Sequence, residues 1–463
     1  MGVIASVSST LSFGLVNGGH VGMVFGWLVP CFFVMFIALS MAELASSMPT
    51  SAGLYYFAAK LAPERYSPLA SWITGWANVT GQVTLVCGID YTCAQMITTA
   101  ITVGTDGRTI ISAGGTYGIL LALLICHGLL CSSGTKVLAR LNLIYAPLTI
   151  GTTMAAIVSL LVLSKGNRAT TKEAFTSFEN NSGWSNNVWT FFLSFTAAMW
   201  TLTGYDSACH VSEETANAQK AAPAAIILSV MLTASLGWLT LIAVSFATPS
   251  VSDVLSSDLP LPMGQVFLNN LGKSGMLAIW GAIIVVQFVT AAAQTVDASR
   301  VVFAFARDNA LPGSFIWKRI NTHTQTPVNA VWFTVGAAAI CGLLGFSETA
   351  LISLAGSSVI GLYISYAVPI FLRVTSGRSK LIPGPFGLGR LAVPIGTIAV
   401  AWVIFIVIVL LFPPGQHIND EDMNYAVVII MAVFLFATLS WVTSARKWFI
   451  GPVRTIDDVV APK

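Results

Sequence analysis

The sequence predicts an all-helical membrane protein in which twelve segments cross the bilayer. First, hydrophobic residues make up 55% of the 463-residue chain and charged residues only 9%, whereas a soluble domain carries about 25% charged residues. Second, the apolar residues gather in twelve runs along the chain. Third, Lys and Arg residues are distributed unevenly between alternate connecting segments, as expected of a protein with an inner and an outer side.

Eleven of the twelve runs are long enough to cross about 30 Å of hydrocarbon at about 1.5 Å per residue. The first is the exception, because its helix would be only about 22 Å long. It lacks a charged start and a small-residue cleavage site, which excludes a signal peptide, so we expect a spanning helix whose start is missing. The runs cover residues 2–17, 22–45, 67–101, 114–132, 141–163, 187–210, 223–248, 275–297, 328–346, 349–373, 391–412 and 424–443.

The basic residues predict the orientation. With a cytoplasmic N-terminus, 17 of the 22 Lys and Arg residues fall on the inner side and 5 on the outer side, as the positive-inside rule requires. Both termini are therefore predicted to be cytoplasmic. Because the connecting segments are short, we expect residues 1–443 to form one transmembrane domain and residues 444–463 a short cytoplasmic tail.

The sequence TLTGYDSACHVSEET, at residues 201–215, interrupts a long apolar run. An Asp at the bilayer centre costs roughly 2.5–3.5 kcal/mol, and irregular helices persist in lipid only where they are buried in protein or line a cavity. Gly204 and Asp206 therefore predict an unwound segment beside a polar cavity. The alternative is a helix that simply reaches the cytoplasm, which we favour for the polar residues further along the chain: His210, Glu213 and Glu214.

An opened sixth helix exposes main-chain groups to a substrate. Its carbonyls can accept hydrogen bonds from an ammonium group, and the N–H groups that begin the next half-helix can bind a carboxylate. The predicted substrate-binding residues here are Trp200, Thr201, Leu202, Thr203 and Gly204.

The first helix carries a second polar stretch, with hydroxyl groups at Ser6, Ser8, Ser9 and Thr10. Close packing of helices through small residues is the alternative explanation. Polar breaks in helices one and six would divide the chain into two similar halves of five helices, which is the pattern of transporters with inverted repeats.

The third span contains three further polar residues. Asn78 and Gln82 are four positions apart and share a helical face, so they either line the substrate path or bond to a neighbouring helix. Asp90 is costly within a span and is a functional candidate by default.

We expect structural roles for the remaining polar residues. Glu43 is predicted to pair with Lys60 or Arg65 at the inner surface. A cytoplasmic charge cluster, which fixes the orientation or forms an inner gate, is expected of Asp297, Arg300, Arg307 and Asp308. Packing, with a gate as the alternative, is expected of Tyr363 and Tyr366 in helix ten.

Four stretches resemble the amino acid–polyamine–organocation transporters, and among them the fungal GABA, amino-acid and choline permeases. They are residues 13–27, which include GGHVGMVFGW; residues 42–63, AELASSMPTSAGLYYFAAKLAP; residues 204–226, GYDSACHVSEETANAQKAAPAAI; and residues 297–312, DASRVVFAFARDNALP. The resemblance covers nearly the whole chain. It departs at Ala52, where glycine is usual, and at the start, where relatives have a cytoplasmic tail and a complete first helix.

The resemblance implies a LeuT-like fold with ten core helices in two inverted five-helix repeats, helices one and six being discontinuous, and two more helices at the C-terminus. It also implies that the substrate carboxylate meets the backbone and hydroxyls of the first helix. The amino group would meet the carbonyls of Trp200, Thr201 and Thr203, with the Trp200 ring as a gate. Asp206 would be linked to proton movement.

Asp90 and Tyr205 are the other candidates for proton coupling or gating. The function implied by the resemblance is proton-coupled uptake of a small amine-bearing solute, first of all an amino acid such as GABA, at the plasma membrane or at a vacuolar or other endomembrane. Choline or a polyamine is the alternative substrate, and a nutrient sensor with this fold is the alternative function.

Other function classes find no support in the sequence. It has no G-x-x-x-x-G-K-[ST] motif and no H-E-x-x-H motif, and its net charge of +3 is too small to suggest a nucleic-acid partner. We therefore expect a solute, a proton and the lipid bilayer as partners, and no enzyme activity, cofactor or metal.

Overall fold

The computed structural model describes residues 2–164, 168–347, 349–413, 415–416 and 423–452, and within these ranges it contains helices and no strand. This confirms the predicted all-helical class. The long helices of the first half are α1 (Val3–Val16), α2 (Gly19–Ser47), α4 (Ser67–Gly104), α5 (Ala113–Ser132) and α6 (Thr135–Leu163). The corresponding helices of the second half are α8 (Asn187–Leu193), α9 (Thr196–Thr201), α10 (Ser207–His210), α11 (Ala218–Phe246), α13 (Pro262–Arg307), α15 (Val328–Cys341) and α16 (Ala350–Val374).

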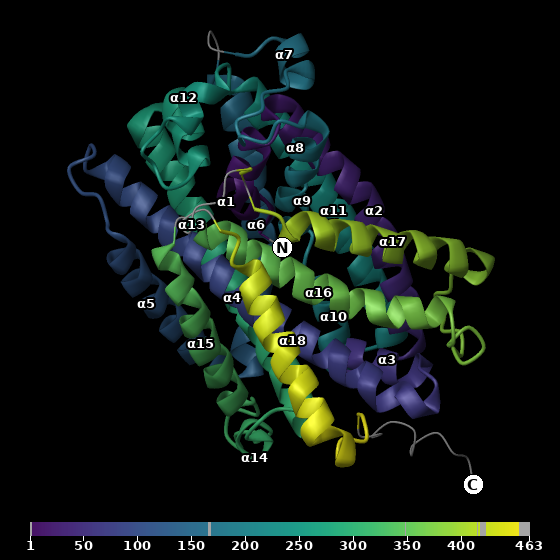
Figure 1. Cartoon of the computed structure of the whole chain (residues 1–463). Helices are drawn as coiled ribbons and strands as arrows, with labels where there is room; N and C mark the ends of the chain where they lie inside the picture. Colours follow the sequence, from purple (N-terminus) through teal and green to yellow (C-terminus); the bar gives the residue numbers. More distant parts are fainter. Residues whose placement is uncertain (1, 165–167, 348, 414, 417–422, 453–463) are drawn as a thin grey trace.

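The remaining elements complete the bundle in Figure 1. Two helices follow the second half, α17 (Ala392–Leu411) and α18 (Ala426–Thr443). Short helices connect the long ones: α3 (Leu54–Leu61), α7 (Thr171–Thr176), α12 (Val251–Leu255) and α14 (Ser314–Trp317). The predicted tail at residues 444–463 lies mostly outside the described residues, and its separation from the transmembrane domain stays a prediction.

Nine helices of the described chain are long and apolar enough to cross a membrane. The other three predicted segments coincide with α1, which has only 14 residues, with the longer but more polar α4, and with the broken series α8, α9 and α10. A multi-pass membrane protein is therefore confirmed, whereas the count of twelve crossings stays a prediction.

The helix contacts match the expected two-fold repeat for four of the five helix ranks. Helices with the same rank in the two halves pack against each other: α1 on α9, α2 on α11, α4 on α13 and α5 on α15. A two-fold axis that exchanges two five-helix halves produces this pairing. In Figure 1, α1 and α9 lie within the bundle, surrounded by longer helices, and α1 is buried along most of its length.

The sixth predicted segment is interrupted as expected. It consists of α8, α9 and α10, and residues 202–206 between α9 and α10 are not helical. Asn186 caps the start of this series by accepting hydrogen bonds from the N–H groups of Val188 and Trp189.

The polar stretch of the first helix, by contrast, does not unwind. The helix α1 is continuous from Val3 to Val16, so the polar stretch does not form the expected break within these residues. The reason is that the hydroxyls of Ser9 and Thr10 both donate to the Ser6 carbonyl, each at 2.8 Å. Hydroxyls that bond back to the preceding turn are satisfied within a helix.

Glu43 has a partner that the sequence did not suggest. Its carboxylate lies 3.2 Å from Nε of Arg373, at the end of α16, and it also accepts from the backbone N–H of Leu388. Arg373 comes from a helix distant in sequence, so spacing along the chain could not identify it.

Candidate functional site

The break in the sixth segment exposes main-chain groups, as predicted. Gly204 has a φ of +87°, a conformation that glycine adopts readily and other residues rarely do. Within the described chain, the carbonyls of Thr201 and Thr203 accept no backbone hydrogen bond. The Leu202 carbonyl accepts from the Tyr363 hydroxyl at 3.4 Å. Two carbonyls therefore remain able to accept from a ligand.

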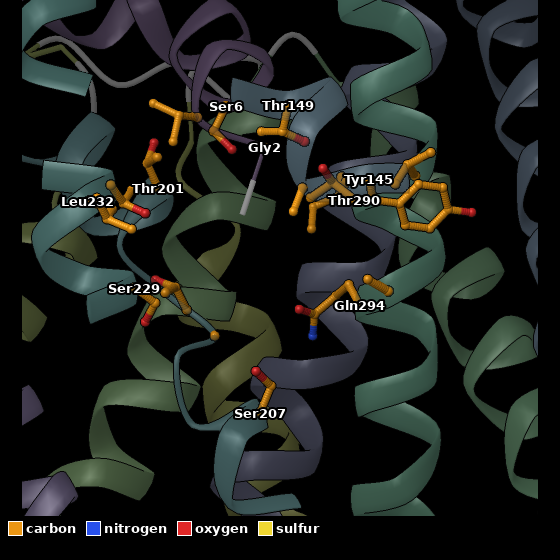
Figure 2. Close-up of a pocket in the computed structure, with 18 of the residues that line it drawn as sticks. Gly2, Ser6, Tyr145, Thr149, Thr201, Ser207, Ser229, Leu232, Thr290 and Gln294 are labelled. Atoms are coloured by element: carbon orange, nitrogen blue, oxygen red, sulfur yellow. The ribbon is translucent and has the colours of Figure 1, made fainter. Parts of the chain in front are cut away.

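A cavity of about 570 Å³ lies beside this break, and we call it the central cavity. It is formed by α1, α4, α6, α9, the break itself, α10, α11 and α13. Figure 2 shows Thr201, Ser229 and Leu232 on one side, with Thr290 and Gln294 across from them. Its volume is in the range of sites for small organic ligands.

The lining of the central cavity is rich in hydroxyl groups and poor in charge. Asp297 is the only acidic residue among the described residues that line it, and these include no Lys, Arg or His. Trp200 and Tyr145 are its aromatic residues. The hydroxyl-bearing residues, besides Tyr145, are Ser6, Thr149, Thr153, Thr201, Thr203, Ser207, Ser229, Thr233 and Thr290.

The N-terminal end of α1 reaches the central cavity through Gly2, Val3 and Ser6. The first N–H groups of a helix have no partner within it, and they favour negative charge. Ser8, Ser9 and Thr10 do not line this cavity. Of the four predicted hydroxyls on α1, the structure places only that of Ser6 at the cavity.

Four of the five substrate residues predicted around the break line the cavity: Trp200, Thr201, Thr203 and Gly204. Leu202 does not. The Trp200 ring packs closely on α4, because a Cβ at Gly88 would lie 2.4 Å from ring atom Cη2. The ring thus forms part of the wall between α4 and α9.

At the end of the break, Asp206 is fully buried in a polar network. The Tyr366 hydroxyl donates to its Oδ1 at 2.6 Å and also accepts from the Gly204 N–H at 3.4 Å. The Tyr205 ring packs on Tyr366 with a centroid distance of 5.1 Å. Tyr366, expected to be a packing residue, therefore bonds to both Gly204 and Asp206.

Gln82 connects Asp206 to the cavity. Its Nε2 donates to Asp206 Oδ2 at 3.3 Å and to Asp297 Oδ2 at 3.1 Å, and its Oε1 accepts from Gln294 Nε2. Asp297 and Gln294 line the cavity, whereas Gln82 itself does not. Gln82 thus supports the cavity floor and is not part of its surface.

Asn78 and Asp90 lie elsewhere on α4. Both are buried and neither lines the central cavity. Asp90 Oδ1 lies 2.9 Å from Nδ1 of His127 on α5, with both side chains fully buried. The structure therefore separates Asp90 from Asp206.

Sequence reasoning missed Asp297 and His210 as parts of the site, having assigned them to the cytoplasmic surface. Both are buried, and His210 Nε2 lies 3.4 Å from Asp206 Oδ2. A signal was present, because Gln294 and Asp297 are three residues apart and therefore share a face of α13.

Comparison with known proteins agrees with this architecture. The family model for amino acid permeases matches residues 1–434. The Arabidopsis thaliana amino-acid permease BAT1 is 34% identical over 98% of this chain and 90% of its own length. An amino-acid permease of Schizosaccharomyces pombe is 36% identical over 98% of this chain and 84% of its own length. The Saccharomyces cerevisiae GABA-specific permease is 34% identical over 99% of this chain and 81% of its own length.

The matches span almost the whole chain and most of each relative, and the break, the cavity and the repeated halves lie within the matched residues. Together these findings exclude an enzyme and identify an integral membrane transporter. The chain belongs to the amino acid permease family.

Proposed function

We propose that this protein takes up a zwitterionic amino acid, with GABA as the first candidate, together with a proton. The observation that carries the proposal is the chemistry of the central cavity. One buried acid, Asp297, faces it from α13, while the start of α1 lies at its wall and no basic side chain of the described residues lines it. An ammonium group suits the acid, and a carboxylate suits the helix start.

The break supplies the remaining contacts. The free carbonyls of Thr201 and Thr203 can accept from the ammonium group, and the hydroxyls around the cavity can bond to either end of the solute. The relative named as GABA-specific makes GABA the first solute to test. Choline would require an aromatic cage, for which the described lining offers only Trp200 and Tyr145.

Proton coupling is proposed through Asp206. Its carboxyl is buried, hydrogen-bonded to Tyr366 and Gln82, and linked through Gln82 to the acid of the cavity. Ionisable residues within a membrane bundle typically mark substrate or proton paths. We further propose cytoplasmic termini, on the distribution of the 22 basic residues. The proposed location is the plasma membrane, because uptake from outside the cell requires the transporter there.

The test is radiolabelled uptake in transporter-deficient yeast, comparing GABA, neutral and basic amino acids, choline and putrescine, with and without a proton uncoupler. We expect saturable uptake of at least one zwitterion that collapses with the uncoupler. Uptake restricted to choline or putrescine would contradict the proposed substrate class, and uncoupler-resistant accumulation would contradict proton coupling.

Asp206→Asn is expected to reduce uncoupler-sensitive accumulation more strongly than substrate binding. The asparagine side-chain oxygen can still accept a hydrogen bond from Gln82 or Tyr366, but the side chain has no carboxyl proton to exchange. Binding is measured by competition at equilibrium, and accumulation by the final internal concentration. Accumulation by the variant that remained fully sensitive to the uncoupler would remove Asp206 from this role.

A further inference from the structure

A second cavity lies beyond the floor of the first. It has a volume of about 160 Å³, and we call it the vestibule. Its lining includes Ser51, His210, Glu213, Arg300, Arg307 and Pro327, which belong to segments predicted to be cytoplasmic or at the inner end of a span. Asp297 lines the central cavity and His210 lines the vestibule, whereas Asp206 lines neither.

A chain of polar side chains joins the two cavities. Gln82 Nε2 lies 3.1 Å from Asp297 Oδ2 and 3.3 Å from Asp206 Oδ2. From the same Asp206 oxygen, His210 Nε2 is 3.4 Å away. All four side chains belong to residues that are at most 5% exposed, so the chain is shielded from bulk water between its two ends.

The hydrogen bonds of His210 determine where its proton lies. Nδ1 is 3.0 Å from the carbonyl oxygen of Ser51. A carbonyl only accepts hydrogen bonds, so Nδ1 carries the hydrogen, and in the neutral ring Nε2 is then an acceptor. Nε2 faces Asp206 Oδ2, and two unprotonated acceptors at 3.4 Å would repel each other. Nε2 makes no hydrogen bond in this structure, so the contact becomes favourable when one of the two atoms carries a proton.

The surroundings favour a single exchangeable proton at this contact. The other oxygen of Asp206, Oδ1, is occupied by the Tyr366 hydroxyl at 2.6 Å. Glu213 accepts from the Ser51 N–H at 2.9 Å and from the Thr50 hydroxyl at 3.2 Å, so its carboxylate is bonded on the vestibule side. The other titratable or charged groups near the pair are Tyr205, Cys209, Asp297, Arg300 and Tyr363.

We propose that Asp206 and His210 form a proton-transfer pair that delivers the co-transported proton from the buried carboxyl of Asp206 to the vestibule. The inference rests on the proposed proton-coupled uptake and identifies its exit path. Asp206 carries the proton in the loaded state, and the substrate ammonium at Asp297 adds a positive charge nearby that favours the loss of this proton. The carboxyl O–H bond of Asp206 then breaks as an N–H bond forms at His210 Nε2, which leaves a carboxylate and an imidazolium.

The imidazolium releases its proton to water in the vestibule, and Asp206 takes up the next proton when the site opens to the outer side. No oxidant, reductant or further reactant is needed. His210 is suited to this step because its ordinary titration range lies near neutral pH, and because its ring is held in one orientation by the Ser51 carbonyl.

The test uses His210→Gln in the whole chain, reconstituted into proteoliposomes. A glutamine side chain can bond to Ser51 and Asp206 but cannot take up and release a proton. The probe is radiolabelled GABA, or the panel member with the highest uptake if GABA is not transported. A pH difference of one unit drives at most about tenfold accumulation at one proton per solute. We expect wild-type protein to approach that ratio and the variant to approach a ratio of about one.

Exchange of internal for external solute, which needs no net proton movement, is expected to persist in His210→Gln. The matched control is His127→Gln, which removes a fully buried histidine from a similar pair with Asp90, at 2.9 Å, without touching either cavity. The control is expected to keep the wild-type accumulation. If His210→Gln does not reach the membrane, Asp206→Asn tests the same pair from its other member and must give the same loss.

Full accumulation by His210→Gln overturns the proton-transfer pair while leaving the proposed function intact. Equal losses in His210→Gln and His127→Gln also overturn it, because the effect would then follow from helix packing. Wild-type protein that exchanges GABA but shows no response to the pH gradient contradicts the proposed coupling itself, and the pair with it.

Discussion

At the scale of single residues, Asp297 is the side chain expected to contribute most to substrate binding. It is the one acid at the surface of the central cavity among the described residues, and Gln82 holds its Oδ2 in place. Removing one partner of a buried, hydrogen-bonded charge pair typically costs about 2–5 kcal/mol. We therefore expect Asp297→Asn to raise the KM for a zwitterion by at least about tenfold, measured as initial uptake rates against concentration. Asp258→Asn, at an exposed position, is the control, and an equal KM in both variants would exclude Asp297 from substrate binding.

Gly204 is the residue expected to matter most for the backbone conformation of the break. Its φ is +87°, which strains the backbone of any residue with a side chain, although a Cβ would make only an ordinary contact, 3.4 Å from Oε1 of Gln294. Strained backbone of this kind costs about 1–3 kcal/mol, which corresponds to about 5–150-fold in a conformational equilibrium. Gly204→Ala is expected to lower uptake by a factor in this range at normal surface expression. Gly281→Ala, where a Cβ meets open space, should transport normally, and equal uptake by both variants would contradict the role of the break.

At the scale of elements, a close helix crossing holds the floor of the site in place. α16 crosses α4 so closely that a Cβ on Gly361 would lie 2.8 Å from the backbone N of Gly81 and 2.9 Å from the Ala77 carbonyl oxygen. Small residues permit such close approach of membrane helices. This crossing positions Tyr366 of α16 and Gln82 of α4 on either side of Asp206.

Gly361→Val is expected to destabilise the protein, because overpacking typically costs about 1–3 kcal/mol. The measurement is thermal unfolding in detergent, monitored by labelling of buried cysteines with a fluorescent maleimide. Gly151→Val, on α6 with open space around its Cβ position, should unfold at the wild-type temperature. Equal unfolding temperatures for the two variants would mean that the crossing can relax at little cost.

Elements also explain which parts of the site the sequence could predict. The break near Gly204 was predictable because a glycine and an acid interrupt an apolar run. The floor was not, because the apolar run of the eighth segment ends at residue 297, whereas α13 continues to Arg307. Asp297 therefore lies deeper than its position at the end of a run suggests. The hydroxyls of α1 were a misleading signal, because Ser9 and Thr10 bond to their own helix.

At the scale of the whole molecule, the pairing of the two halves brings the parts of the candidate site together. The pairing of α1 with α9 and of α4 with α13 brings the start of α1, the break and Asp297 around one cavity. Hydropathy could predict the helical class, and the polar stretches in helices one and six could suggest the repeat. They could not predict the polar network, because His210, Gln82 and Asp297 come from three separate helices and meet only through tertiary packing.

The central claim is that the transported amino acid occupies the cavity beside the break. The most direct measurement is the rate at which a thiol reagent labels a cysteine introduced by Ser229→Cys, on the cavity wall, with and without each solute that the uptake panel shows to be transported. The exposed native Cys126 is first replaced by serine, and Ser256→Cys, at an exposed position outside the cavity, is the control. We predict that a transported solute slows labelling in Ser229→Cys and leaves Ser256→Cys unchanged. Labelling of Ser229→Cys at the same rate with and without the solute would contradict the claim.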